Sequence, residues 1–361
     1  MNQKINHIIH YMKIQINIFD LFRFFLKQPL SVLRFFLSIL FGKKLIENLE
    51  SVADIANSET YSLSKTWFLD FLPEALFHLD ANQITQLKYF ILVSSICAAL
   101  GLLGRLNLLI LAFIGYFLFG TIEGIGVFDH HLSLPSQVIL VLALVTGTMK
   151  ISIDYTLLNL YYKQKNKTLN FQENHKWGLN LILGLVMLTY LTAGISKFRY
   201  GNGTDWLNGS TLSFYLKERT DTYKDNNAQL IIGDNKISDQ DKWKDKFGFI
   251  GHTYGNYQTS KRWNEIANYI ASNKPLVILL SIGSVLFELL GFMLFINTRY
   301  RNIYLICAII FHMSIGQLMG ISFRQYRVIC FCLIDWEYLF KNSISKFKNF
   351  RKIKKLRAIA H

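Results

Sequence analysis

Proline and cysteine are scarce in this chain of 361 residues, which contains only four of each. Proline breaks helices, so its scarcity permits long uninterrupted helical segments. Pro135 and Pro275 stand where apolar runs begin, and the first position of a helix tolerates proline best. The cysteines all lie inside apolar runs, and none has a histidine at metal-ligand spacing. We therefore expect buried thiols rather than a disulfide framework or a metal site.

Charged residues are also few, at 17% of the chain, whereas hydrophobic residues make up 51%. Soluble domains rarely carry so many apolar residues in long runs. A helix that crosses a bilayer needs about 20 mostly apolar residues. The sequence therefore predicts an all-α fold, a polytopic transmembrane helix bundle. The first residues lack the short apolar core and small-residue cleavage site of a cleavable signal peptide, so none is expected.

Eight apolar segments predict eight membrane-spanning helices. The first, Leu30–Phe41, extends backwards through Leu21–Phe25, and basic residues interrupt it. Its front half is expected to lie flat on the membrane as an amphipathic helix, and a different assignment here would give seven or nine helices. Gly104 and Arg105 are expected to form a tight turn between the second and third helices. The remaining seven segments are Leu87–Leu103, Leu106–Thr121, Leu134–Ile153, Trp177–Lys197, Pro275–Ile296, Ile303–Ile321 and Gln325–Phe340.

Lysine and arginine in the short loops predict the orientation of the bundle. The loop Ile122–Ser133 has neither, whereas the loop before the fifth helix contains Lys163, Lys165 and Lys167. Basic loops stay on the cytoplasmic side, so both termini are expected in the cytoplasm. The net charge of +15 is concentrated in these loops and at the C-terminal end, which favours lipid headgroups over nucleic acid as the partner.

The chain divides into an N-terminal interfacial segment (1–29), a transmembrane domain (30–340) and a basic cytoplasmic tail (341–361). One polar stretch within the domain, residues 198–274, predicts a small external cap over the bundle. Short helices are expected in this cap, for instance at Lys261–Ala271, where three apolar residues fall at helical spacing.

Ionisable residues at membrane depth are costly, so each is a candidate for function. Lys197 ends the fifth helix and is expected at the outer end of the bundle. Burial disfavours the charged form of a lysine, which would make the amine a base. The alternative is a lysine that extends along the helix end to the headgroups.

Further polar residues occur in the later helices. His312 lies near the middle of the seventh helix, where an imidazole can relay a proton, or can simply hydrogen-bond a neighbouring helix. Gln317 and Arg324 follow it towards the outer side, and Arg324 is also suited to anchoring at headgroups. Glu288, deep in the sixth helix, is expected to pair with an arginine or with His312.

The triplet Asp129-His130-His131 lies at the outer mouth between the third and fourth helices. Adjacent histidines in one loop are weak evidence for a metal, so we expect none and favour hydrogen bonding of a ligand by His130. The topology allows His130, His312 and Lys197 to approach one another in the outer half of the membrane. A polar pocket there, under the cap, would suit a small amphipathic ligand that enters from lipid.

Several motifs resemble the vitamin K-dependent gamma-glutamyl carboxylase and its bacterial relatives, the HTTM (horizontally transferred transmembrane domain) proteins. The similarity lies in Ala193-Gly-Ile-Ser-Lys197, followed by Asp205-Trp206-Leu-Asn-Gly209. The Asp129-His130 loop, Glu288 and Phe311-His312 through Phe323 are similar as well. The order and spacing of these motifs hold over residues 31–340.

This resemblance implies a reduced quinone of the vitamin K or menaquinol type as cofactor. It implies that Lys197 acts as the base on the hydroquinone and that His130 hydrogen-bonds the ring, with His312 also in the catalytic set. Trp206, Glu288, Gln317 and Arg324 are the expected cofactor-binding residues. The deprotonated hydroquinone reacts with oxygen in that family, and the resulting base removes a glutamate proton before carbon dioxide is captured.

Two departures from the animal carboxylase leave glutamate carboxylation open. That enzyme has two adjacent lysines where this chain has Ser196-Lys197, and it carries a luminal beta-rich domain that nothing here resembles. Two classes of function follow. The first is a quinone-dependent membrane enzyme that modifies a peptide or protein, which requires Lys197 to be buried, to face a cavity and to lie close to His130 or His312. The second is a non-catalytic membrane partner in peptide toxin maturation, export or self-protection, for which an exposed Lys197 and a packed, pocketless interior are expected.

Overall fold

The computed structural model describes residues 27–56, 66–124, 130–165, 167, 176–199, 204, 206–213, 215–216, 243–244, 250–251 and 260–341. Helices dominate these residues, as predicted, and the strands among them form one two-residue antiparallel ladder, β1 (Trp243–Lys244) with β2 (Ile250–Gly251). The helices of the first half are α3 (Pro29–Ala56), η1 (Trp67–Leu69), η2 (Glu74–Phe77), α4 (Ala81–Leu100), α5 (Gly104–Gly124), α6 (His130–Leu144), η3 (Thr146–Met149) and α7 (Ile153–Gln164). Those of the second half are α8 (Lys176–Arg199), α10 (Lys261–Ser272), α11 (Lys274–Leu289), η4 (Leu290–Phe292), α12 (Met293–Ile296), α13 (Thr298–Met319) and α14 (Arg324–Leu333).

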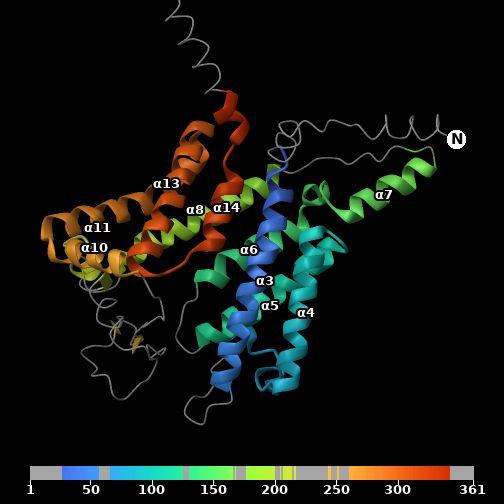
Figure 1. Cartoon of the computed structure of the whole chain (residues 1–361), viewed down its shortest axis with the longest axis horizontal. Helices are drawn as coiled ribbons and strands as arrows, with labels where there is room; N and C mark the ends of the chain where they lie inside the picture. The colour runs from blue at the N-terminus through green and yellow to red at the C-terminus, as the bar shows by residue number, and fades with distance from the viewer. Residues whose placement is uncertain are drawn as a thin grey trace, which may run out of the picture.

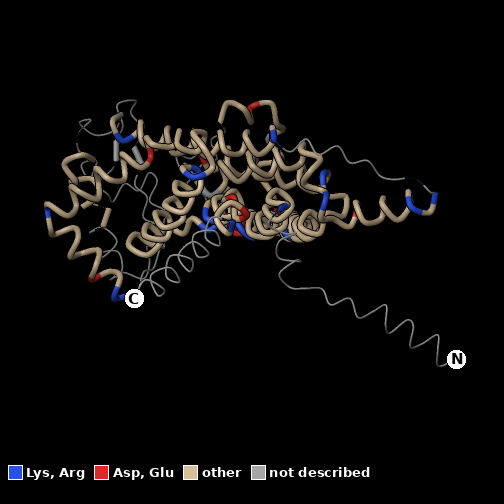
Figure 2. Tube along the Cα trace, turned by 90° about the horizontal axis from the view of Figure 1, so that it is seen from above, with Lys and Arg blue, Asp and Glu red and all other residues tan. Residues whose placement is uncertain are grey.

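Five stretches of the described chain are helical, long and apolar enough to cross a membrane, which identifies an integral membrane protein. They are Ala81–Leu100, Gly104–Glu123, Lys176–Phe198, Lys274–Ile296 and Thr298–Met319. Many of their large apolar side chains are exposed on the protein surface, as expected for contact with lipid. The spans contain few charged residues, and most of the described trace is neither basic nor acidic (Figure 2).

The other three predicted spans are helical but differ from the prediction in length. α3 continues to Ala56, well beyond Phe41, and includes several charged residues, whereas the segment Leu21–Phe25 lies outside the described residues. α6 ends at Leu144, nine residues earlier than predicted, and the chain continues as the 3-10 helix η3. α14 ends at Leu333, although residues 336–341 are helical again. Eight apolar segments therefore form helices, but three of them do not have the length or composition of a span.

The turn between α4 and α5 lies three residues earlier than predicted. Gly101 has φ 71° and Leu103 has φ 45°, so the left-handed conformation that reverses the chain occurs before Gly104. Gly104 and Arg105 are instead the first residues of α5. Glycine adopts positive φ without steric cost, and this makes Gly101 a suitable end for α4. The prolines also differ, because Pro275 lies in the first turn of α11 as predicted, whereas Pro135 lies inside α6.

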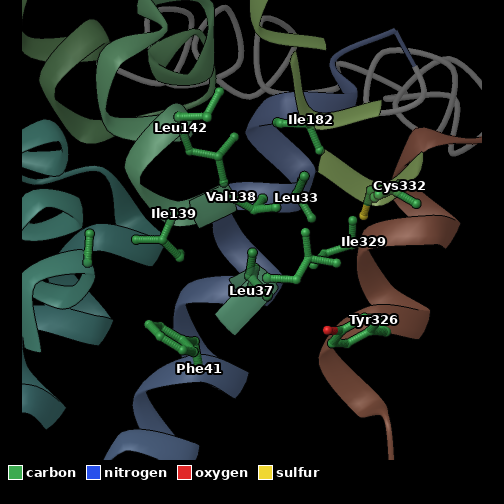
Figure 3. Close-up of a cluster of buried hydrophobic side chains, with 14 of the residues drawn as sticks. Leu33, Leu37, Phe41, Val138, Ile139, Leu142, Ile182, Tyr326, Ile329 and Cys332 are labelled. Carbon is green, nitrogen blue, oxygen red and sulfur yellow. The ribbon is translucent and has the colours of Figure 1, made fainter. Parts of the chain in front are cut away.

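The largest hydrophobic core lies where α3, α6, α8 and α14 meet. Leu33, Leu37 and Phe41 of α3 are fully buried between side chains of the other helices. Figure 3 shows them beside Val138 and Ile139 of α6, with side chains of α8 and α14 completing the cluster. This core connects the helices α3–α6 to the second half of the chain, from α8 onward, so the two halves form one packed unit (Figure 1).

The predicted cap is partly described, and its helix at Lys261–Ala271 is confirmed as α10. The buried face of α10 packs on α11 and α13. Leu216 joins Ala267, Ile270 and Val277 in a second, smaller hydrophobic cluster. The residues around Trp206–Leu216 therefore pack against the beginning of α11, next to the end of α8.

Candidate functional site

The helix α8 comes close to α11 and to the following η4 at two glycines, Gly194 of α8 and Gly291 of η4. A Cβ atom at Gly194 would lie 3.1 Å from the Cβ of Glu288, and one at Gly291 would lie 3.2 Å from the carbonyl oxygen of Met187. Small residues at such crossings allow membrane helices to approach each other closely. The crossing brings the C-terminal end of α8 beside the acidic residue of α11.

Lys197 and Glu288 form a buried ion pair across this crossing. The Lys197 Nζ lies 2.5 Å from the Glu288 Oε2, and the two side chains are 13% and 7% exposed. A charge removed from water is tolerated when a hydrogen-bonded partner of opposite charge is in contact with it. Lys197 is therefore largely shielded from solvent, which is one of the conditions of the enzyme hypothesis. The prediction that Glu288 pairs with an arginine or with His312 is wrong, because its partner is Lys197.

Trp206 covers the same ammonium group from the outside. The Nζ of Lys197 lies 4.6 Å from the centroid of the indole ring, a distance typical of a cation–π interaction. Tyr215 stacks on Trp206 with ring centroids 6.2 Å apart. The backbone of Trp206 is held by the hydroxyl of Ser281, which donates to its carbonyl oxygen. Positive φ at Gly209 lets this segment lie directly on the backbone of α11.

His312 lies in an aromatic environment between α8, α13 and α14. The hydroxyl of Tyr190 and the Nε2 of His312 are 2.7 Å apart, and both side chains are buried. The rings of Phe323 and Tyr326 lie 4.6 Å and 5.2 Å from the imidazole. Phe287, which precedes Glu288, packs edge-on against Tyr190 at 5.5 Å. The imidazole is thus held in one orientation by a hydrogen bond and by surrounding rings.

The two polar pairs lie on the same side of α8. Tyr190 and Lys197 are seven residues apart, which in an α-helix corresponds to nearly two turns and about 10 Å along the axis. The neighbouring residues Phe287 and Glu288 of α11 contact Tyr190 and Lys197 respectively. One face of α8 therefore presents an acid–base pair near its end and a tyrosine–histidine pair deeper in the bundle.

For Gln317, Arg324 and His130, the other predicted site residues, the described part of the structure gives no contact with Lys197. Gln317 lies on α13, and its Oε1 is buried without a hydrogen-bond partner among the described residues. Arg324 is exposed at the first residue of α14, a position suited to anchoring at headgroups. His130 is the first residue of α6, but its side chain, like Asp129, lies outside the described part. Whether it approaches Lys197 stays a prediction.

Metal binding is not indicated by the described side chains, which contain no group of three or more His, Cys, Asp or Glu residues that could hold an ion. The Asp129-His130-His131 triplet lies outside that search. The cysteines in the described part are free thiols. The acid–base groups that the structure brings together are the pair Lys197–Glu288 and the pair Tyr190–His312.

One buried charge was not identified as a site residue from the sequence. Arg34 of α3 is only 1% exposed, and its guanidinium donates to the carbonyl oxygens of Ala99 (3.2 Å) and Ile151 (2.5 Å). It thereby joins α3, the end of α4 and the segment before α7. An arginine inside an apolar run is the signal that could have revealed it. Together with a hydrogen bond to the Met149 Sδ (3.5 Å), these contacts hold three segments of the chain together, which indicates a structural role.

Comparison with known proteins gives no further assignment. No protein-family model, no curated protein and no solved structure matches the chain.

Proposed function

We propose that the chain is a membrane-embedded, quinone-dependent enzyme in a bacterial inner membrane, with both termini in the cytoplasm. In this proposal it is a relative of the HTTM proteins and modifies a peptide or protein, with Lys197 as general base. The observation that carries the proposal is the buried pair of Lys197 and Glu288 beneath the Trp206 ring. A buried ion pair gives little net stability compared with apolar residues of similar size, so function is a physical reason to keep one.

The contact between Lys197 and Glu288 explains how a buried lysine could act as a base. The Lys197 ammonium donates a hydrogen bond to the Glu288 carboxylate, with Nζ and Oε2 2.5 Å apart. In the proposed mechanism Glu288 is the positioning residue and would take up the ammonium proton when the substrate binds. The neutral Lys197 amine would then accept a proton from a substrate hydroxyl.

The donor set and the aromatic side chains around this pair fit a reduced quinone. The Trp206 ring lies over the Lys197 nitrogen, and Tyr215 stacks on Trp206. Tyr190 and His312 supply polar groups deeper along the same face of α8. When bound, a hydroquinone would supply an acidic phenolic hydroxyl and two electrons. Lys197 would take the phenolic proton, the rings would orient the molecule, and the bundle would exclude water.

A photoreactive menaquinone analogue in proteoliposomes tests the location of this site. The proposal predicts adducts on α8 and on the Trp206–Leu216 segment, and competition by unmodified menaquinol. The purified protein should also oxidise menaquinol, and Lys197→Ala should slow this oxidation by about 10²–10⁴-fold. Lys176→Ala, at the exposed opposite end of α8, is the matched control and should keep full activity.

The alternative, a non-catalytic partner in peptide toxin maturation or export, predicts an exposed Lys197. The 13% exposure of this side chain favours the enzyme. Absence of specific adducts together with absence of menaquinol oxidation would favour the partner instead.

A further inference from the structure

The helix α7 stands apart from the packed bundle. None of its residues is buried, and it extends away from the body of the molecule (Figure 1). Apolar side chains that would normally be buried are nevertheless exposed on it, with Leu157, Leu160 and Tyr161 each more than half accessible. In an aqueous environment such a face would be unfavourable, because each large apolar side chain gains about 1.5–3 kcal/mol on burial.

The beginning of α7 is fixed to the turn between α4 and α5. The carboxylate of Asp154 accepts hydrogen bonds from the backbone N–H groups of Leu103 and Gly104, each at 2.9 Å. The N–H of Asp154 donates to the carbonyl oxygen of Gly101 at 3.1 Å. Since α4 and α5 both have the length and composition of membrane spans, the short turn that joins them must lie at a membrane surface. The first residues of α7 therefore lie at that surface as well.

The sequence of α7 has an apolar stripe and, beside it, a polar stripe. Ile153, Leu157, Leu160 and Tyr161 follow the i, i+4, i+7, i+8 spacing of a single helix face. Thr156, Asn159 and Lys163 follow the i, i+3, i+7 spacing of a polar stripe that lies roughly a third of a turn around the helix from this face. With 12 residues the helix is about 18 Å long, too short to cross a bilayer. Its geometry is that of a helix that lies in the interface.

Basic residues collect at the free end of this helix. Lys163 and Lys165 are exposed there, Lys167 follows directly, and basic residues mark the tip of the helix in Figure 2. Lysines beside an interfacial helix attract anionic headgroups, and each strengthens the attachment about fivefold.

We propose that α7 is an interfacial anchor that lies in a surface of the bilayer and binds anionic lipid. Ile153, Leu157 and Leu160 enter the acyl-chain boundary, while Lys163, Lys165 and Lys167 contact lipid phosphate groups. The occupant of the exposed face is thus the anionic membrane itself, not a second copy of the chain or another protein. This proposal is independent of the chemistry at Lys197.

Depth measurements on the full-length protein test this proposal. Leu157→Cys and Asn159→Cys are each labelled with an environment-sensitive fluorophore in a Cys97→Ala, Cys307→Ala background, in which the remaining Cys330 and Cys332 are buried. The labelled proteins are placed in nanodiscs of phosphatidylcholine with phosphatidylglycerol. We expect lipids with a quencher on the acyl chain to quench the probe at 157 and aqueous iodide to quench the probe at 159. Equal quenching by iodide at both positions would overturn the proposal.

Two further results would also contradict it. Protection of the probe at 157 from both quenchers would mean that a protein surface, such as a second copy of the chain, covers the apolar face. The second concerns the lysines. Each change among Lys163→Gln, Lys165→Gln and Lys167→Gln should reduce the ratio of inserted to detached helix by about fivefold in these discs, measured at position 157. An unchanged ratio after all three changes would show that anionic lipid is not the partner.

Discussion

The ion pair between Lys197 and Glu288 makes a quantitative prediction about stability. Both side chains are buried and in contact at 2.5 Å, so removal of either one leaves the other charge without its partner. Lys197→Met should strand the Glu288 carboxylate, and Glu288→Leu should strand the ammonium. Each single change is expected to lower the free energy of unfolding by about 3–5 kcal/mol. The double variant should be close to wild type, because two apolar side chains of similar size fill the space without a buried charge.

The measurement is reversible denaturation in detergent, followed by helical circular dichroism, for the wild type, both single variants and the double variant. The coupling energy is the difference between the double variant and the sum of the single variants. The exposed pair Lys43–Glu47 provides a matched control. Its N···O distance is 3.7 Å and its side chains are 64% and 53% exposed, so its coupling should not exceed about 1 kcal/mol. A coupling energy between Lys197 and Glu288 as small as that of the control pair would refute the buried pair.

Three further predictions follow from the packing and the topology. Arg34→Met should lower the free energy of unfolding by about 2–4 kcal/mol, measured in the same denaturation assay, because two charged hydrogen bonds to backbone carbonyls are lost. Gly194→Leu should lower the melting temperature, because even a Cβ there meets α11 at 3.1 Å, whereas Gly283→Leu, with nothing within 4 Å, should have little effect. Equal melting temperatures would exclude a close crossing at Gly194. A reporter fused after His361 should be cytoplasmic and one inserted near Asn227 external, and the reverse result would invert the orientation.

The helical fold could be anticipated from the sequence, because it depends on local composition, whereas the sequence left open whether Lys197 is buried or extends to the headgroups. Apolar runs identified every main helix that packs in the bundle, and the spacing at Lys261–Ala271 predicted α10. The residues at which the helices end were harder to predict. α6 stops at Leu144, and the following residues Thr146–Met149 form the 3-10 helix η3 that packs against α3. Hydropathy averaged over a long segment does not locate such a change of conformation.

The partnership of Lys197 with Glu288 was missed although both residues were selected. Each belongs to a different helix, and their contact depends on the angle and depth at which α8 crosses α11. Gly194 allows that crossing, but a glycine inside an apolar helix does not name its neighbour. The helix α7 was missed for a different reason, because its lysines were interpreted only as a signal of orientation. The helical spacing of Ile153, Leu157 and Leu160 was the available indication.

The central claim, that Lys197 is a general base, is tested most directly by one variant that preserves the charge. Lys197→Arg keeps a cation beside Glu288 and beneath Trp206, but a guanidinium stays protonated and cannot accept a proton. The initial rate of menaquinol oxidation by the purified variant is compared with that of wild type and of Lys176→Arg, after thermal melting has verified that all three are folded. The account predicts a rate lower by about 10²–10⁴-fold for Lys197→Arg alone. Menaquinol oxidation at the wild-type rate by Lys197→Arg would contradict it.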